Sequence, residues 1–278
     1  ALTPVEARRP DFRAETALPD SRVPPGRPEA SAAEVRLSSV DPFAECPYLF
    51  ALRAVLGYEE PPREGEYDPL RGGAAMHALW ERVWREYAAS GCRGSIEERT
   101  RRLFDEVVGE NYPSLLRSPS LQRVRSELRG GAARCAAKQD EWEAALRPLR
   151  EEILCEFDLP PLRRGAVAFS GRCDRLDRLK DGRFLLWDYK TGKSSAYGKA
   201  FQLGCYALAV EGGALGGNGC AGWGYVGQKD AAVSGCWDDD VASLLNKRSG
   251  SKTLRERKDG AGQLLSDVAL AMEAKRFP

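Results

Sequence analysis

Two carboxylates and one ammonium group carry the clearest chemistry in this sequence. Asp188 and Lys190 are two residues apart in a segment that reads as a β-strand, and Asp174 lies in the strand before it. Residues two apart in a strand project from the same face, so Asp188 and Lys190 should stand side by side. Their strand is apolar on both faces, which indicates a covered, central strand. Charges buried there are costly unless they are paired or bind a metal.

Two interpretations fit this pattern. If Asp174 faces Asp188, the two carboxylates suit a hard cation such as Mg²⁺ or Mn²⁺. Lys190 could then position or deprotonate an attacking water, or neutralise charge on a phosphoryl group. Alternatively, Asp188 and Lys190 form a simple ion pair at the end of a strand. The spacing alone favours the ion pair, because D-x-K is a short and common pattern.

The hairpin between the two strands separates these interpretations. With a two-residue turn, Asp174 and Asp188 would point to opposite faces of the sheet. With a three-residue loop over residues 180–182, whose last residue is a left-handed glycine, Leu179 faces Arg183. Asp174 then lies directly opposite Asp188. The metal site requires this second register, and we predict it.

Four more polar side chains are candidate members of the site. His77 is the only histidine in the chain, and it lies at the edge of the apolar stripe of a predicted helix. Gln202 and Tyr206 are four residues apart and therefore share one face of a helix that follows the Asp188 strand. Glu156 lies in the first predicted strand. Each also has an ordinary interpretation: a boundary histidine, the polar rim of a half-buried helix, and a strand residue that faces solvent.

Helices dominate the first half of the chain and strands the second. Apolar spacing predicts helices over residues 41–55, 76–87, 95–110 and 119–147, with a loop over 57–73. Strands are predicted over residues 152–159, 167–179, 183–189, 219–227 and 233–237, with a helix over 198–210 and two more at the end. This order predicts an α/β domain: a mixed central sheet flanked by helices, with a mainly helical N-terminal lobe.

Composition separates a tail from the folded part. Six prolines fall within residues 1–36, which is typical of a tail or linker. The missing initiator Met suggests a piece cut from a longer protein. Residues 37–278 should form the folded domain, with a helical lobe over 37–150 that carries His77 and a sheet core over 151–278.

Bulk composition says little about partners. The chain has 42 basic and 41 acidic residues, so its net charge of +1 does not indicate a nucleic-acid partner. No segment approaches the roughly 20 apolar residues of a membrane span, and no signal peptide is recognisable, which predicts a soluble, cytoplasmic protein. The eight cysteines are scattered without a C-x-x-C pair, which indicates reduced thiols rather than a cysteine zinc site.

Five segments, in order along the chain, resemble the PD-(D/E)XK nuclease superfamily, and specifically nuclease domains of the RecB and AddB type. They are residues Ser39–Tyr48, Gly73–His77, Gly171–Asp177, Asp188–Gly192 and Gln202–Tyr206. Each segment alone is a weak signal, but five in the family's order are strong. The resemblance implies a restriction-endonuclease-like fold.

The resemblance also implies roles for individual residues. His77, Asp174 and Asp188 would bind the metal, with help from the carbonyl of Tyr189, and Lys190 would be catalytic. It further implies that two helix residues, Gln202 and Tyr206, support the site or the DNA strand. From its own position, Glu156 could be a further acidic contributor or a strand residue that faces solvent.

The implied activity is hydrolysis of phosphodiester bonds in DNA by an Mg²⁺- or Mn²⁺-dependent exonuclease that acts on single-stranded ends in repair or recombination. A helicase motor would lie elsewhere in the parent protein or complex, because no P-loop is present. The alternatives are a non-catalytic DNA-binding module with this fold and a stand-alone endonuclease.

Many relatives hold an iron–sulfur cluster with one early cysteine and three near the C-terminus. Cys46 matches the early position, but no cysteine follows Cys236, so no [4Fe–4S] cluster is expected unless a missing tail supplies three more thiolates.

Overall fold

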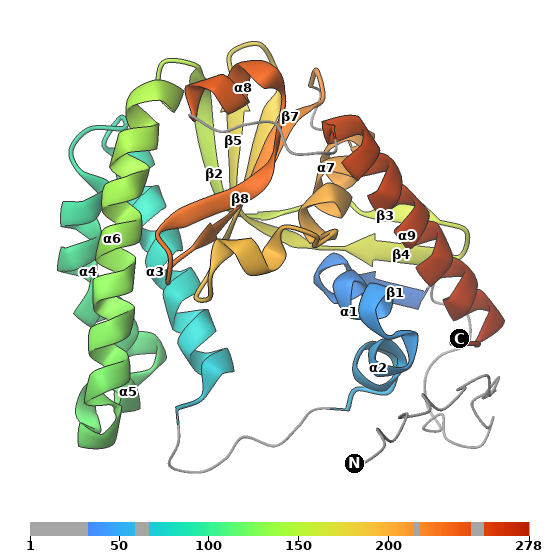
Figure 1. Cartoon of the computed structure of the whole chain (residues 1–278), viewed down its shortest axis with the longest axis horizontal. Helices are drawn as coiled ribbons and strands as arrows, with labels where there is room; N and C mark the ends of the chain where they lie inside the picture. Colours follow the sequence, from blue (N-terminus) through green and yellow to red (C-terminus); the bar gives the residue numbers. More distant parts are fainter. Residues whose placement is uncertain (1–32, 59–66, 214–216, 246–252, 278) are drawn as a thin grey trace, which may run out of the picture.

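The computed structural model describes residues 33–58, 67–213, 217–245 and 253–277. It shows a mixed α/β fold in which helices of the N-terminal half cover one face of a central sheet and later helices cover the other (Figure 1). No helix within the described ranges is both long enough and apolar enough to span a membrane.

The central sheet has five strands in the order β2-β5-β6-β7-β8. They are β2 (Arg150–Asp158), β5 (Arg172–Leu179), β6 (Phe184–Lys190), β7 (Cys220–Gly227) and β8 (Ala232–Trp237). Strands β6 and β7 are parallel, and the other neighbours are antiparallel. Residues 184–189 of β6 are all buried, which confirms the covered central strand that its apolar residues predict.

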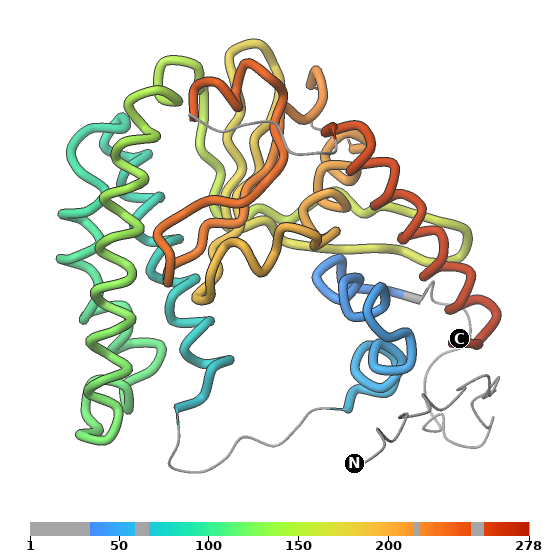
Figure 2. The backbone as a smooth tube through the Cα atoms, in the orientation of Figure 1, coloured from blue at the N-terminus to red at the C-terminus, as the bar shows by residue number. Residues whose placement is uncertain are grey.

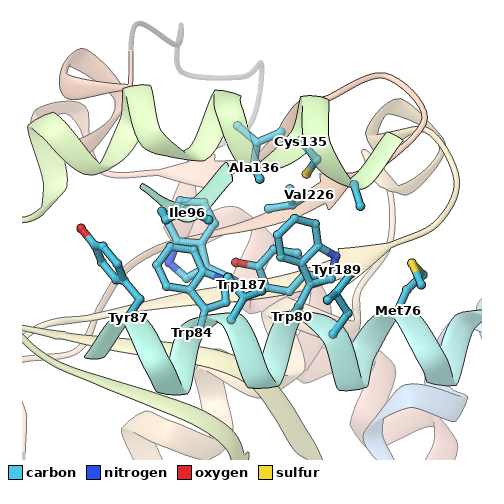
Figure 3. Close-up of a cluster of buried hydrophobic side chains, with 14 of the residues drawn as sticks. Met76, Trp80, Trp84, Tyr87, Ile96, Cys135, Ala136, Trp187, Tyr189 and Val226 are labelled. Carbon is cyan, nitrogen blue, oxygen red and sulfur yellow. The ribbon is translucent and has the colours of Figure 1, made fainter. Parts of the chain in front are cut away.

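The helical lobe packs on one face of this sheet. It consists of α3 (Pro69–Ala89), α4 (Ile96–Asn111), α5 (Pro113–Arg117), the 3₁₀ turn Pro119–Leu121 and α6 (Gln122–Leu146). Met76, Trp80 and Trp84 project from one side of α3 toward Trp187 and Tyr189 of β6 (Figure 3). The rings of Trp80 and Tyr189 stack with centroids 5.0 Å apart. This aromatic contact fixes α3, and with it His77, against the sheet.

The other face is covered by α7 (Gln202–Gly212) and α9 (Leu254–Ala274), and α8 (Asp239–Leu244) follows β8. Beside them lies a three-stranded sheet in the order β1-β4-β3, made of β1 (Ala33–Arg36), β4 (Val167–Ser170) and β3 (Leu162–Arg164). The remaining elements are the 3₁₀ turns Leu37–Ser39 and Ser194–Tyr197, helices α1 (Val40–Glu45) and α2 (Pro47–Phe50), and a π-helix, Ala51–Val55. The backbone trace shows α1 and α2 beside the C-terminal end of α9 (Figure 2).

The β5–β6 hairpin has the register that the metal site requires. The backbone N–H of Leu179 donates to the carbonyl of Arg183 at 2.8 Å, and Leu176 pairs with Leu186. Gly182 closes the three-residue loop with φ +84°, the left-handed conformation that glycine adopts at little cost. The predicted three-residue loop is therefore confirmed.

Several predicted element boundaries are wrong. The helix expected over 41–55 is interrupted at Cys46, whose backbone is extended, so that α1, α2 and a π-helix replace it. Helix α3 begins at Pro69, seven residues before Met76, because Asp68 caps it through the N–H groups of Leu70 and Arg71. The loop expected over 57–73 therefore ends earlier, and residues 59–66 of it lie outside the described residues.

Two differences concern the second half of the chain. The strand expected over 167–179 is split at Gly171, where the chain passes from the small sheet to the large one. Helix α7 begins at Gln202 rather than at residue 198, because a 3₁₀ turn precedes it. The division into a tail and a nuclease domain stays a prediction, although residues 33–36 of the expected tail form β1 and pair with β4.

A buried network of four charges joins the helical lobe to the sheet. Asp177 of β5 accepts hydrogen bonds from Arg175 at 2.6 and 2.7 Å and from the indole N–H of Trp187 at 3.1 Å. Glu143 of α6 pairs with Arg175 at 2.9 Å and with Arg150 of β2. Because two arginines balance two carboxylates, the network is neutral, which lowers the cost of burying it.

Candidate metal centre and active site

His77 contacts Asp174 near the N-terminal end of β5. Because α3 docks on the sheet through its aromatic stripe, the imidazole Nδ1 of His77 lies 3.1 Å from Oδ2 of Asp174. The same oxygen accepts a hydrogen bond from the backbone N–H of Tyr189 at 2.8 Å. Burial lowers the pKa of His77, but the hydrogen bond to Asp174 and the charges of Asp174 and Asp188 outweigh it and raise the pKa to about 9.

Glu156 joins this pair from the edge strand β2. Its neighbours Cys155 and Phe157 pair with Arg175 and Cys173, which places Glu156 opposite Asp174. Each of three residues, His77, Glu156 and Asp174, offers one possible ligand atom, and these three atoms lie within 4.8 Å of one another. Burial, followed by the charge of Asp174, raises the pKa of Glu156. The positive charges of His77 and Arg172 offset part of this rise.

The backbone of Glu156 is itself strained. Its φ is +49°, a left-handed conformation that costs a non-glycine residue roughly 1 to 2 kcal/mol. Strand pairing continues on both sides of it, so the strain is local. Backbone strain of this kind clusters at functional sites.

Asp188 and Lys190 lie on the α7 face of β6, beside this cluster. Asp188 is only 3% exposed. The Nζ of Lys190 lies 2.8 Å from its Oδ2, so the two groups form a buried ion pair. Burial, followed by the charge of Asp174, raises the pKa of Asp188. Burial lowers the pKa of Lys190, but the charge of Asp188 outweighs it and raises that pKa.

Gln202, the first residue of α7, connects the two charged groups. Its Nε2 donates to Oδ1 of Asp188 at 3.2 Å and to the hydroxyl of Tyr206 at 2.9 Å. Its Oε1 accepts a hydrogen bond from Nζ of Lys190 at 3.2 Å. The buried amide therefore holds Asp188 and Lys190 in place, and Tyr206 holds the amide. The ring of Tyr197 adds a cation–π contact, 5.3 Å from Nζ of Lys190.

The donor set fits a divalent cation. Two carboxylates and one imidazole, those of Glu156, Asp174 and His77, offer ligand atoms that converge within 4.8 Å of one another. Carboxylate oxygens suit Mg²⁺ and Mn²⁺, and one imidazole nitrogen beside them is acceptable to Mn²⁺. The ligands would be His77, Asp174, Asp188 and Glu156.

The structure thus brings together all but two of the residues that the sequence singles out for a site. The main-chain N–H of Tyr189 contacts Asp174, while its hydroxyl donates to Gln139 at 2.7 Å on the other face. A role for its carbonyl stays a prediction. Cys46 is exposed between α1 and α2, and no metal-ligand group found in the described part of the chain includes it.

Some contacts near the site have no simple sequence signal. The alternation of β5 places Arg175 and Asp177 on one face, but nothing local predicts that Glu143 and Arg150 join them. Asp41 accepts a hydrogen bond from the backbone N–H of Phe201, 160 residues away in the chain. Only the tertiary structure reveals either contact.

The mixed sheet between two helical layers, with acidic groups and a lysine gathered at the end of its central strand, is a restriction-endonuclease-like α/β fold. A family model described as the PD-(D/E)XK nuclease superfamily matches residues 37–278. The chain belongs to the PD-(D/E)XK nuclease superfamily. No curated protein is similar enough to the chain to count as a match.

Proposed function

We propose that this chain is a metal-dependent deoxyribonuclease that hydrolyses phosphodiester bonds from single-stranded ends. The observation that carries the proposal is the convergence of His77, Glu156 and Asp174, which offer ligand atoms within 4.8 Å of one another. The buried carboxylate of Asp188, 3% exposed, lies beside them and pairs with the ammonium of Lys190 at 2.8 Å. Three carboxylates and one imidazole in this arrangement are better explained by a divalent cation than by the ion pair of Asp188 and Lys190 alone.

Each side chain then has a definite task. When bound, the cation supplies Lewis-acid stabilisation of the phosphoryl oxygens and activates water. Lys190 presents a positive charge beside Asp188, where it orients the water or stabilises charge that develops on the phosphate. Gln202 fixes both groups, and Tyr206 anchors Gln202. Because Gln202 and Tyr206 are buried at 8% and 3% exposure, we assign them to support of the site rather than to the DNA.

Binding of DNA should rest on phosphate contacts and should weaken as the salt concentration rises. We further propose a RecB- or AddB-type role in repair or recombination in the cytoplasm, in which a helicase motor delivers the strand. These finer assignments rest on the five segments that resemble that type.

Cleavage of end-labelled linear and circular single-stranded DNA, with Mg²⁺ or Mn²⁺, tests the proposal. Asp174→Ala and Lys190→Ala should abolish metal-dependent cleavage. Two matched controls should retain it: Asp158→Ala, at the exposed end of β2, and Lys180→Ala, in the β5–β6 loop. Cleavage of circular single-stranded DNA would identify an endonuclease. No cleavage by the parent with either metal would favour a DNA-binding module.

A further inference from the structure

Asp41 lies far from β6 in the sequence but beside the active site in the fold. It belongs to α1, and its Oδ1 accepts a hydrogen bond of 2.6 Å from the backbone N–H of Phe201. Phe201 immediately precedes α7, the helix that begins with Gln202. A side chain from the N-terminal segment therefore reaches the first turn of the helix that supports Asp188 and Lys190.

Helix α7 has no cap of its own. Its N-cap residue, Phe201, makes no side-chain capping hydrogen bond. The first N–H groups of any helix lack partners within the helix, and a carboxylate placed there satisfies one of them and interacts favourably with the helix dipole. Asp41 supplies this carboxylate from another element. Helix α1, to which Asp41 belongs, has no side-chain cap at its own N-terminus.

The surroundings of Asp41 show that its placement is costly. Burial raises the pKa of Asp41, while hydrogen bonds from the backbone N–H groups of Phe201 and Gln202 and the charge of Lys190 lower it. The charge of Glu45, on the same helix, raises it slightly. Asp41 is therefore a half-buried carboxylate held by the N–H groups of Phe201 and Gln202 and by the charge of Lys190, and it is not a solvated surface group.

We propose that Asp41 is a positioning residue of the active site. It fixes the first turn of α7, so that the amide of Gln202 stays between Asp188 and Lys190. The effect on cleavage rests on the proposed nuclease function, whereas the effect on α7 does not.

Amide hydrogen exchange, resolved by residue with NMR, tests the structural half of this inference. In Asp41→Ala, exchange should accelerate by roughly tenfold at Phe201 and in the first turn of α7, as expected for loss of a cap. Asp41→Asn keeps an acceptor oxygen and should stay within about threefold of the parent, since capping asparagine and aspartate are comparable. Glu45→Ala, an exposed carboxylate on the same helix, is the control and should change nothing there.

Unchanged exchange in Asp41→Ala would overturn the inference, whether or not the protein cleaves DNA. Equal acceleration in α7 and in the distant helix α4 would also overturn it, because that pattern means general destabilisation.

Single-turnover cleavage tests the functional half. Asp41→Ala should slow the cleavage step by about tenfold with little change in DNA affinity, and Asp41→Asn should restore most of the rate. In a Gln202→Ala background, Asp41→Ala should have no further effect, because the two residues act through one contact. Additive losses would overturn the inference. If the parent is inactive, the proposed function fails and the exchange experiment still decides the role of Asp41.

Discussion

Replacing Asp177 with alanine should lower the free energy of unfolding by about 3 to 5 kcal/mol. This is the usual cost of removing one partner of a buried ion pair and leaving the other charge buried. Asp177 is 0% exposed, and its arginine partners Arg175 and Arg150 are 3% and 6% exposed. Without Asp177, the two guanidinium groups share one carboxylate, Glu143, and the network carries an uncompensated buried charge. The indole N–H of Trp187 also loses its partner.

The magnitude follows from the contacts that are lost. Four hydrogen bonds of 2.6 to 3.4 Å disappear: two from Arg175, one from Arg150 and one from Trp187. Hydrogen bonds to charged groups contribute roughly 1.5 to 3 kcal/mol each, and part of that sum is offset by the desolvation that the native network already requires. Because the free energy of unfolding of a whole domain is about 5 to 15 kcal/mol, the variant should be near the limit of stable folding.

Urea unfolding followed by circular dichroism measures this change. Glu127→Ala removes an exposed carboxylate that pairs with Arg123, and it should cost at most about 0.5 kcal/mol. A loss below about 1 kcal/mol in Asp177→Ala would show that the network contributes no more than an isolated surface ion pair does.

The stability that Asp177 contributes should also depend on pH. Burial raises the pKa of Asp177, but the charges of Arg175 and Arg150 and the hydrogen bonds outweigh it and lower the pKa. A lowered folded-state pKa contributes stability that is present above the unfolded value of about 3.9 and is lost as the pH falls through the folded value. The difference in stability between parent and Asp177→Ala should therefore be constant from pH 7 to about 5 and shrink below about 4.

Three further outcomes are expected. Glu156→Gly should be more stable than Glu156→Ala by about 1 kcal/mol, because glycine relieves the strain at φ +49°; equal urea midpoints would contradict this. Mn²⁺ at about a hundred times its Kd should stabilise the parent by about 2.7 kcal/mol, and His77→Ala should lose most of that gain at the same concentration. Tyr206→Phe should slow single-turnover cleavage by about fivefold, since Gln202 loses one hydrogen bond. A drop in DNA affinity instead would place Tyr206 on the DNA.

The central strands were predictable because local rules decide them. A strand that is apolar on both faces must be covered, and β6 is. Gly182 permits the three-residue loop, which sets the register of Leu176 and Leu186 and directs Asp174 toward Asp188. It would also permit a two-residue turn, so the requirement that Asp174 face Asp188 decided between the two registers. These inferences need no knowledge of distant parts of the chain.

The remaining features depend on tertiary contacts. His77 approaches Asp174 only because α3 docks through Trp80 on Tyr189, which the spacing of residues within α3 does not reveal. The break at Gly171 is hidden in a continuous strand pattern, because the chain changes sheets without losing its apolar character. Asp41 shows the same limit, because nothing in its local sequence indicates that it accepts a hydrogen bond from the N–H of Phe201, 160 residues away.

In the proposed mechanism, His77, Asp174, Asp188 and Glu156 hold the cation, while Lys190 contributes to the cleavage step. Mn²⁺ binding and single-turnover cleavage of single-stranded DNA, measured on the same samples of the parent, Asp174→Ala and Lys190→Ala, test this mechanism most directly. Asp174→Ala should lose both properties, and Lys190→Ala should bind Mn²⁺ at least as tightly as the parent but should not cleave. Cleavage by Lys190→Ala at the parental rate, or undiminished Mn²⁺ binding by Asp174→Ala, would contradict it.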